Sequence, residues 1–267
     1  MPHFSSISSR ENPIFRYAMS MHNRKRAQTE GLVFLEGVRL CEDALLSGCR
    51  PEIFFFTEDR ETLISEWEER FSFFADCRAF ILSDSLMAKL SQTKTSQGIA
   101  MLVPEPRYAG EYPKKGRDIY LIGEKISDPG NLGAMIRMAD AFSFSAVFLT
   151  KGSVDPFNEK VIRASMGSCF HIPLFFSLET EEVIETMKRD KVQVIGTHLN
   201  GSSLDDAAVS FPCAYIVGNE ATGMSDPAVS LCDVLIKIPM DGAAESLNAS
   251  GAATVVGYVL SRNRRGR

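Results

Sequence analysis

Short apolar runs alternate with helical patterns through the second half of the chain, and this alternation most constrains the fold. Continuous apolar strands separated by helices form mostly parallel sheets that are covered on both faces. The sequence therefore predicts an α/β fold with a mostly parallel sheet. The predicted strands are Ile119–Ile122, Ala146–Leu149, Ile172–Phe176, Val192–Thr197, Ala214–Val217 and Val234–Ile238.

A break in composition separates this region from the first hundred residues. Residues 104–117 contain three prolines and two glycines and few apolar residues, which is typical of a linker. The preceding segment also alternates between strand and helix patterns, with strands predicted at Leu32–Leu35, Pro51–Thr57, Phe80–Leu82 and Ile99–Val103. We therefore predict a small α/β domain at 1–103, a linker at 104–117 and a second domain at 118–267.

The composition excludes several classes of protein. With 267 residues, 45% hydrophobic and 24% charged, the chain has the content of an ordinary folded protein. No apolar run approaches the roughly 20 residues that a membrane span needs, and Met1–Arg10 lacks the features of a signal peptide. The six cysteines and four histidines follow no zinc-site or disulfide spacing. We expect a cytoplasmic protein with no membrane segment and no metal site.

Basic residues gather at both ends of a chain whose net charge is −5. The chain ends in the basic segment 262–267, and the first 30 residues also carry an excess of cations. Charge alone leaves two interpretations open, namely solvated ends and local contacts with phosphate groups. The N-terminal cations are Arg10, Arg16, Arg24, Lys25 and Arg26.

The common phosphate-binding motifs are absent from the sequence. There is no G-x-G-x-x-G and no G-x-x-x-x-G-K-[ST], and Gly130–Gly133 is only a G-x-x-G within a proline turn. A nucleotide-like cofactor must therefore bind by another geometry.

The segment Asp128–Arg137 predicts the start of a helix directly after a strand. Asn131 is placed to cap this helix, and Arg137 follows within two turns. A helix start offers N–H groups to an anion, and an arginine adds a planar fork of donors suited to phosphate. A capped helix with a surface arginine is the alternative interpretation.

Two polar, glycine-bearing turns lie further along the chain, at Ile216–Gly223 and Glu245–Gly251. The first follows a predicted strand and the second opens a predicted helix that begins at Ser246, so both offer free backbone groups. Glu220 has no second carboxylate beside it for acid/base catalysis, and its better role is to hold neighbouring loops. Ser246 and Asn248 begin this helix and are interpreted as capping residues, and for Ser246 capping is compatible with contact to a ligand.

These three segments together resemble the motifs of the SpoU (TrmH) family of RNA 2′-O-ribose methyltransferases. The resemblance covers roughly Asp118–Leu260 and rests on N-x-G-x-x-x-R at 131–137, G-N-E-x-x-G at 218–223, and I-P-M at 238–240 with E-S-L-N-A-S at 245–250. The first half resembles the family's substrate-binding domain, a small ribosomal-protein-like α/β sandwich, through Asn12–Lys25 and Phe34–Gly37.

The resemblance implies a SPOUT α/β-knot, in which the C-terminal segment passes through a loop to form a deep trefoil knot. It also implies S-adenosylmethionine as the cofactor, bound in that knot largely by backbone groups. Gly218 would admit the ligand where a Cβ would intrude. The cofactor-binding residues that it implies are Thr197, Leu199, Gly218, Ile238, Met240, Ser246 and Leu247.

The resemblance gives catalytic positions to Arg137, Asn131, Glu220, Ser246 and Asn248. A guanidinium resists deprotonation, so we interpret Arg137 as a clamp on the RNA phosphate that stabilises developing alkoxide charge. The family also implies a homodimer and a structured RNA substrate gripped by the N-terminal cations. The separate N-terminal domain favours ribosomal over transfer RNA. A non-catalytic RNA-binding protein and an enzyme that methylates a base nitrogen are the alternatives.

Overall fold

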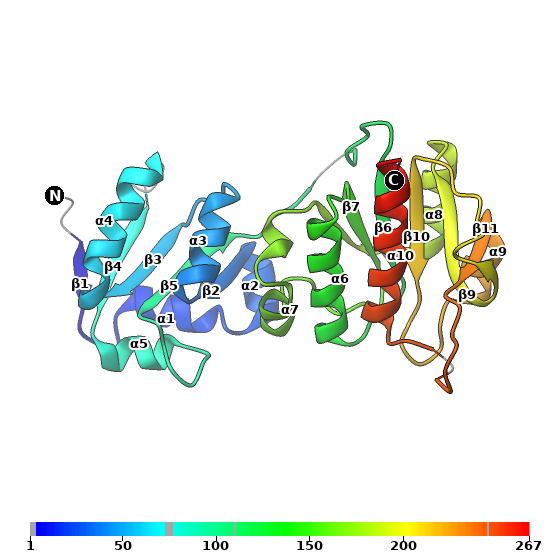
Figure 1. The fold of residues 1–267 in the computed structure, drawn as a ribbon. Helices are drawn as coiled ribbons and strands as arrows, with labels where there is room; N and C mark the ends of the chain where they lie inside the picture. The colour runs from blue at the N-terminus through cyan, green and yellow to red at the C-terminus, as the bar shows by residue number, and fades with distance from the viewer. Residues whose placement is uncertain (1–3, 73–76, 109–110, 245, 267) are drawn as a thin grey trace. The chain divides into compact units, whose positions relative to one another are not determined.

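The computed structural model describes residues 4–72, 77–108, 111–244 and 246–266 (Figure 1). The chain divides into two compact units, Met1–Pro106 and Arg107–Arg267. The division falls inside the predicted linker, whose limits at 104 and 117 stay a prediction. Among the described residues, no helix is both long and apolar enough to cross a membrane.

The first unit is built on a mixed sheet in which the described strands follow the order β1-β4-β3-β5-β2. β5 is antiparallel to both β2 and β3, and the other pairs are parallel. The strands are β1 (Ser5–Ile7), β2 (Leu32–Glu36), β3 (Ile53–Thr57), β4 (Arg78–Leu82) and β5 (Ile99–Pro104). The helices are α1 (Pro13–Ser20), α2 (Arg24–Glu30), α3 (Val38–Leu46), α4 (Glu61–Arg70) and α5 (Asp84–Leu90), with a short 3₁₀ turn at Glu58–Arg60.

Alternate residues of β3 enter two separate packing layers of this unit. Phe55 belongs to a buried cluster that includes Phe15 of α1 and Met87 of α5. Its neighbour Phe54 meets the ring of Trp67 on α4, with the ring centroids 6.0 Å apart. Because successive strand residues point to opposite faces, helices cover both sides of the sheet. The unit is therefore an α/β sandwich, as predicted.

The second unit contains an all-parallel sheet in the order β11-β9-β10-β6-β7-β8. The predicted mostly parallel sheet is confirmed. Its strands are β6 (Ile119–Gly123), β7 (Ala146–Thr150), β8 (Leu174–Leu178), β9 (Gln193–Ser203), β10 (Cys213–Val217) and β11 (Val234–Lys237). Its helices are α6 (Pro129–Ala141), α7 (Glu159–Ser165), α8 (Thr180–Arg189), α9 (Asp226–Leu231) and α10 (Ala249–Arg264), with a 3₁₀ turn at Ser168–Phe170.

The two faces of this sheet are covered by different helices. Ile216 of β10 packs in one buried cluster with Ile184 of α8 and Ala228 of α9. Tyr215 points the other way, where its hydroxyl donates to the Ala253 carbonyl of α10 over 2.9 Å. Helix α10 lies beside α6 on that face (Figure 1). The C-terminal helix thus returns to the middle of the sheet after β11 has paired at its edge.

β9 is longer than the sequence predicts, because it continues past Thr197 to Ser203. Most residues of this extension are not apolar, so a pattern of apolar residues does not reveal it. Gly201 lets the extension approach β11, since a Cβ there would lie 2.5 Å from the carbonyl carbon of Ile236. A register shift between Leu235 and Ile236 accompanies this pairing. Residues 197–199 of β9, which lie between the two pairing registers, line a cavity.

Candidate active site

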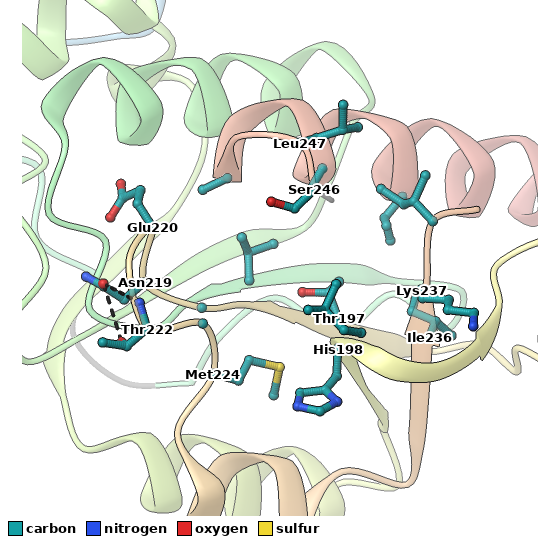
Figure 2. Close-up of a pocket in the computed structure, with 18 of the residues that line it drawn as sticks. Thr197, His198, Asn219, Glu220, Thr222, Met224, Ile236, Lys237, Ser246 and Leu247 are labelled. Atoms are coloured by element: carbon teal, nitrogen blue, oxygen red, sulfur yellow. Dashed lines mark hydrogen bonds between the residues drawn. The ribbon is translucent and has the colours of Figure 1, made fainter. Parts of the chain in front are cut away.

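A cavity of about 370 Å³ opens at the carboxyl ends of β10 and β11 and beside the middle of β9 (Figure 2). Four segments of the chain line it, within 197–199, 217–224, 236–240 and 246–256. All seven residues predicted to bind the cofactor lie in this lining, although their contact with a cofactor stays a prediction. They are Thr197, Leu199, Gly218, Ile238, Met240, Ser246 and Leu247.

The turn that follows β10 is closed by its own hydrogen bonds. The backbone N–H of Asn219 donates to the Gly223 carbonyl over 3.0 Å, and the Gly223 N–H donates back over 2.9 Å. The Asn219 side chain accepts from the Ala221 and Thr222 N–H groups (Figure 2). It also donates to the Lys125 carbonyl over 2.8 Å. Asn219 was not among the predicted site residues, although an asparagine after a strand is a turn-forming signal.

Gly218 is needed for this turn as well as for any ligand. A Cβ at Gly218 would lie 2.3 Å from the Gly223 carbonyl carbon and 2.3 Å from the Met224 nitrogen. Backbone atoms cannot move aside as a side chain can. The sequence suggested that the ligand excludes a side chain here, whereas the structure adds that the protein's own turn does so.

Glu220 accepts hydrogen bonds from the segment that leads into α6. The donors are the Ser127 N–H at 3.2 Å, the Ser127 hydroxyl at 2.9 Å, the Asp128 N–H at 3.1 Å and the Asn131 side-chain amide at 3.1 Å. Partial burial raises the pKa of Glu220, but hydrogen bonds from its own N–H, Asn131 and the 127–128 backbone outweigh this effect and lower the pKa to about 2. The carboxylate is thus a brace and a poor proton acceptor.

Asp128, and not Asn131, caps α6. The Asn131 N–H donates to the Asp128 carboxylate over 2.7 Å, and Pro129 occupies the first helical position. The prediction that Asn131 is the cap is wrong, because an aspartate before a proline provides a cap one turn earlier. The Asn131 side chain is instead free to accept from the Ser250 hydroxyl over 3.0 Å while it donates to Glu220.

The last helix starts three residues later than predicted. α10 begins at Ala249, and the Asn248 side chain caps it by accepting from the Gly251 N–H over 2.7 Å. Ser246 and Leu247 therefore precede the helix, and both line the cavity. Glu245 lies outside the described residues. The capping interpretation of Asn248 is confirmed, and a catalytic role for it stays a prediction.

Arg137 lies on an exposed position of α6, surrounded in sequence by buried residues. Among the residues that the structure describes, its guanidinium has no hydrogen bond and no ion pair. It is also absent from the lining of the cavity in its own chain. The structure thus presents Arg137 as a free donor fork, separate from the predicted cofactor residues.

Glu124 is a buried carboxylate that the sequence motifs did not include. Its side chain is almost fully buried and accepts from the Ser225 N–H at 3.0 Å and the Ser225 hydroxyl at 2.6 Å, with the Thr180 hydroxyl at 3.4 Å. Its N–H donates to the Val217 carbonyl over 2.8 Å. Both ends of the turn after β10 are therefore tied to this residue. A glutamate directly after an apolar strand was the available signal.

The predicted RNA-binding cations of the first unit have two kinds of environment. Arg24 forms an ion pair with the buried carboxylate of Glu105 and donates to the Leu32 carbonyl over 3.2 Å. Arg16 lies 3.5 Å from Glu11 with both side chains exposed. The guanidinium of Arg24 therefore stabilises the unit itself, whereas exposed cations remain at Arg10, Arg16, Lys25 and Arg26.

We compared the chain with models of known protein families and with solved structures. Residues 118–258 match the model of the SpoU rRNA methylase family, and residues 4–101 match that of the MRM3-like substrate-binding domain. The chain belongs to the SpoU rRNA methylase family. This confirms the family that the three motifs indicate, and the solved neighbours confirm the predicted α/β-knot fold class.

Several relatives match over nearly the whole chain. The chain is 33% identical to the Bacillus subtilis 23S rRNA (guanosine(2553)-2′-O)-methyltransferase RlmP, covering 95% of this chain and 98% of the relative. An AdoMet-bound rRNA methyltransferase from Sinorhizobium meliloti superposes with a TM-score of 0.84 at 25% identity, covering 97% of this chain and 98% of that one. The AdoMet complex of the SpoU methyltransferase AviRb from Streptomyces viridochromogenes gives 0.83 at 25% identity, over 96% and 99%.

Proposed function

We propose that the protein transfers the methyl group of S-adenosylmethionine to a ribose 2′-hydroxyl of ribosomal RNA. The observation that carries this proposal is the convergence of four separate segments, with all seven predicted cofactor residues, on one cavity. The predicted enzyme class and the predicted cofactor both agree with the family and with the relatives. The relative from Bacillus subtilis is named for its action on 23S rRNA, which favours ribosomal RNA as the substrate.

The lining of the cavity fits a bent nucleoside cofactor. Its volume of about 370 Å³ lies within the usual range of pockets for small ligands. Ile238, Met240 and Leu247 offer apolar surface, and the turn at 218–223 offers backbone groups for hydrogen bonds. When bound, S-adenosylmethionine supplies an electrophilic methyl group. The hydrogen bonds within the turn hold the backbone in place before any ligand arrives.

The residues of this chain contribute mainly position and charge to the transfer. The ribose oxygen loses a proton and gains the methyl group, so in-line placement supplies much of the rate. Arg137 clamps an RNA phosphate with its planar fork and stabilises negative charge that develops on the oxygen. Glu220, with its pKa near 2, holds the α6 segment and does not accept the proton.

We also propose a homodimer in which Arg137 serves the cavity of the partner chain. Arg137 does not line the cavity of its own chain, and α10 exposes the apolar side chains of Val255 and Tyr258. Light scattering after size-exclusion chromatography should give a dimer at micromolar concentration. Mixing Arg137→Ala chains with Gly218→Ala chains should raise activity above that of either variant alone, since mixed dimers hold one intact site. A monomer, or no recovery on mixing, would contradict this assembly.

The first unit is proposed to hold the RNA backbone through its exposed cations. Recognition of structured RNA relies on shape and phosphate contacts, which Arg10, Arg16, Lys25 and Arg26 can supply. Arg24 contributes indirectly, because its ion pair with Glu105 stabilises the unit. A ribosomal RNA substrate also implies a cytoplasmic location.

Mass spectrometry of nucleosides tests the function directly. Ribosomal RNA lacking the modification is incubated with the protein and S-adenosylmethionine and then digested. A 2′-O-methyl nucleoside is the expected product. A base-methylated nucleoside would indicate the nitrogen-methylating alternative, and RNA binding without any product would indicate the non-catalytic one.

A further inference from the structure

A second cavity, of about 450 Å³, lies at the opposite edge of the parallel sheet. Its lining includes Asp118, Ser145 and Pro173, which directly precede β6, β7 and β8. It also includes Arg264 near the end of α10. Since the active-site cavity lies at the carboxyl ends of the strands, the two cavities occupy opposite edges of one sheet.

We call this second cavity the amino-edge cavity, because it lies at the amino ends of the strands, and several cationic side chains line it. Lys115, Arg117 and Arg264 line it. Arg264 is fixed by donating to the Phe142 and Ser143 carbonyls over 2.7 and 2.9 Å. Burial and then the charge of Arg265 lower the pKa of Arg264, while the carboxylate of Asp118 opposes this shift and Arg117 adds a smaller lowering effect. One lysine and two arginines therefore border the same cavity.

The cavity also holds two carboxylates, Asp118 and Asp140, so its lysine and arginines exceed its carboxylates by one. Asp118 is buried and accepts from the N–H groups of Lys115 and Gly116 over 2.5 and 2.8 Å, and also from the Ser145 hydroxyl. Asp140 lies 3.0 Å from Nδ1 of His171. Within the part of the chain that the structure describes, Lys115 and Arg117 form no ion pair, although Arg117 lies 5.3 Å from the centre of the Phe211 ring.

We propose that this amino-edge cavity binds phosphate groups of the substrate RNA backbone. Like charges held together in a chain of net charge −5 are favourable where a polyanion supplies the opposite charge. Arginine presents a donor fork that matches phosphate geometry. The site goes beyond the N-terminal cations and the catalytic cavity, and its assignment to substrate RNA rests on the proposed function.

The spacing of the two cavities determines which phosphates are bound. β6 spans five residues, which corresponds to roughly 16 Å at 3.3 Å per residue. The contacted phosphates therefore lie several nucleotides away from the methylated ribose, outside the reacting centre. The site should affect the affinity for RNA and leave the affinity for the cofactor unchanged.

The test compares two double variants of the full chain that lose the same charge. Lys115→Gln/Arg117→Gln removes the two exposed cations of the cavity and spares Arg264, whose bonds to carbonyls support α6. Lys188→Gln/Arg189→Gln removes two exposed cations of α8 and is the control. Binding to a ribosomal RNA fragment is measured by fluorescence anisotropy at several salt concentrations, and S-adenosylmethionine binding by calorimetry.

The first double variant should bind RNA about ten-fold more weakly at low salt, with a shallower dependence of log Kd on log salt by roughly 1 to 2. Its Kd for the cofactor and its kcat at saturating RNA should match those of the control. RNA affinity and salt dependence equal to those of the control would overturn the proposal. Binding of inorganic phosphate that is equally tight and lost in the variant would also overturn it, in favour of a small anion. Wild-type protein that binds RNA without forming 2′-O-methyl nucleoside would refute the proposed function and leave the binding comparison valid.

Discussion

At the carboxyl edge of the parallel sheet the Glu220 carboxylate accepts four hydrogen bonds, whereas at the amino edge Lys115 and Arg117 form no ion pair among the described residues. Both edges border a cavity. At the carboxyl edge the side chains of Asn219 and Glu220 are satisfied by hydrogen bonds within the protein, which fixes the backbone around a small ligand. The amino edge keeps charge in excess, which suits a partner that brings the opposite charge.

The comparison shows that a satisfied polar network and an unsatisfied charge cluster have different uses. A turn held by several hydrogen bonds is preorganised, so little ordering remains to be done when the ligand binds. A cluster of like charges is attractive to a polyanion at long range and depends on salt. Arg137 combines the two, because it is a free cation on a helix whose first turn is held by Glu220.

The largest effect is expected for Arg137→Lys, which tests whether the free cation near the carboxyl edge acts in catalysis. Loss of the planar fork should lower kcat/KM by about 10²- to 10³-fold, as for removal of a donor that stabilises developing charge. The Kd for S-adenosylmethionine should not change. Labelled methyl transfer and calorimetry measure these quantities, with Arg163→Lys on α7 as the control. Near wild-type transfer rates would exclude the phosphate clamp.

Gly218→Ala tests the preorganised turn itself. A Cβ would lie 2.3 Å from backbone atoms of Gly223 and Met224, so the turn must shift. We expect at least about ten-fold weaker cofactor binding and a loss of roughly 1–3 kcal/mol in the free energy of unfolding. Gly242→Ala is a matched control, since no atom lies within 4 Å of the position that its Cβ would take. Equal cofactor affinity in both variants would refute the role of the turn.

Glu124→Gln tests whether the hydrogen bonds of the buried Glu124 stabilise the turn after β10. The glutamine side chain keeps the shape of the glutamate but replaces the charged carboxylate that accepts hydrogen bonds from Ser225 and Thr180. Weakened hydrogen bonds to a charged group should cost about 1.5–3 kcal/mol of unfolding free energy. Urea denaturation measures this loss, and cofactor affinity should fall with it. The control is Glu182→Gln at an exposed position of α8, which should change neither the unfolding free energy nor the cofactor affinity. If Glu124→Gln matched this control in both quantities, the charge of Glu124 would not be needed to hold the turn.

The smallest effect at neutral pH concerns the charge of Glu220. Its pKa of about 2 in the folded state lies below its ordinary value of 4.5. The stabilisation from its hydrogen bonds is therefore complete above about pH 4.5 and is lost as the pH falls toward 2. Carboxyl-carbon NMR should give a Glu220 midpoint near 2. A midpoint at or above 4.5 would mean that the carboxylate is not held as described.

The sequence predicted the elements whose apolar pattern matches their burial. Strands were predicted at Ile119–Ile122 and Ala146–Leu149, and β6 and β7 are observed there, each one residue longer. The three-residue β1 was missed, because it is too short to carry a pattern. The extension of β9 was missed as well, because its residues are polar and it pairs only where Gly201 permits close approach to β11.

The candidate site was predictable as a set of residues and not as a network. The motifs named Asn131, Glu220 and Ser246, but the bonds that join Asn131 to Glu220 and Ser250 link positions 89 and 119 residues apart. Glu124 was missed because its partner Ser225 lies 101 residues further along the chain. Local patterns carry no information about such pairs.

The sequence by itself determined the family, the parallel α/β fold and the residues that surround the predicted cofactor, because periodicity and motif spacing are local properties. Only the tertiary structure decided which polar groups are satisfied. It made Glu220 a brace with a low pKa, placed Arg24 in an ion pair with Glu105 and left Lys115 and Arg117 of the amino edge without ion pairs among the described residues. The physical reason is that hydrogen bonding and electrostatic balance depend on distances between side chains that only the folded chain brings together.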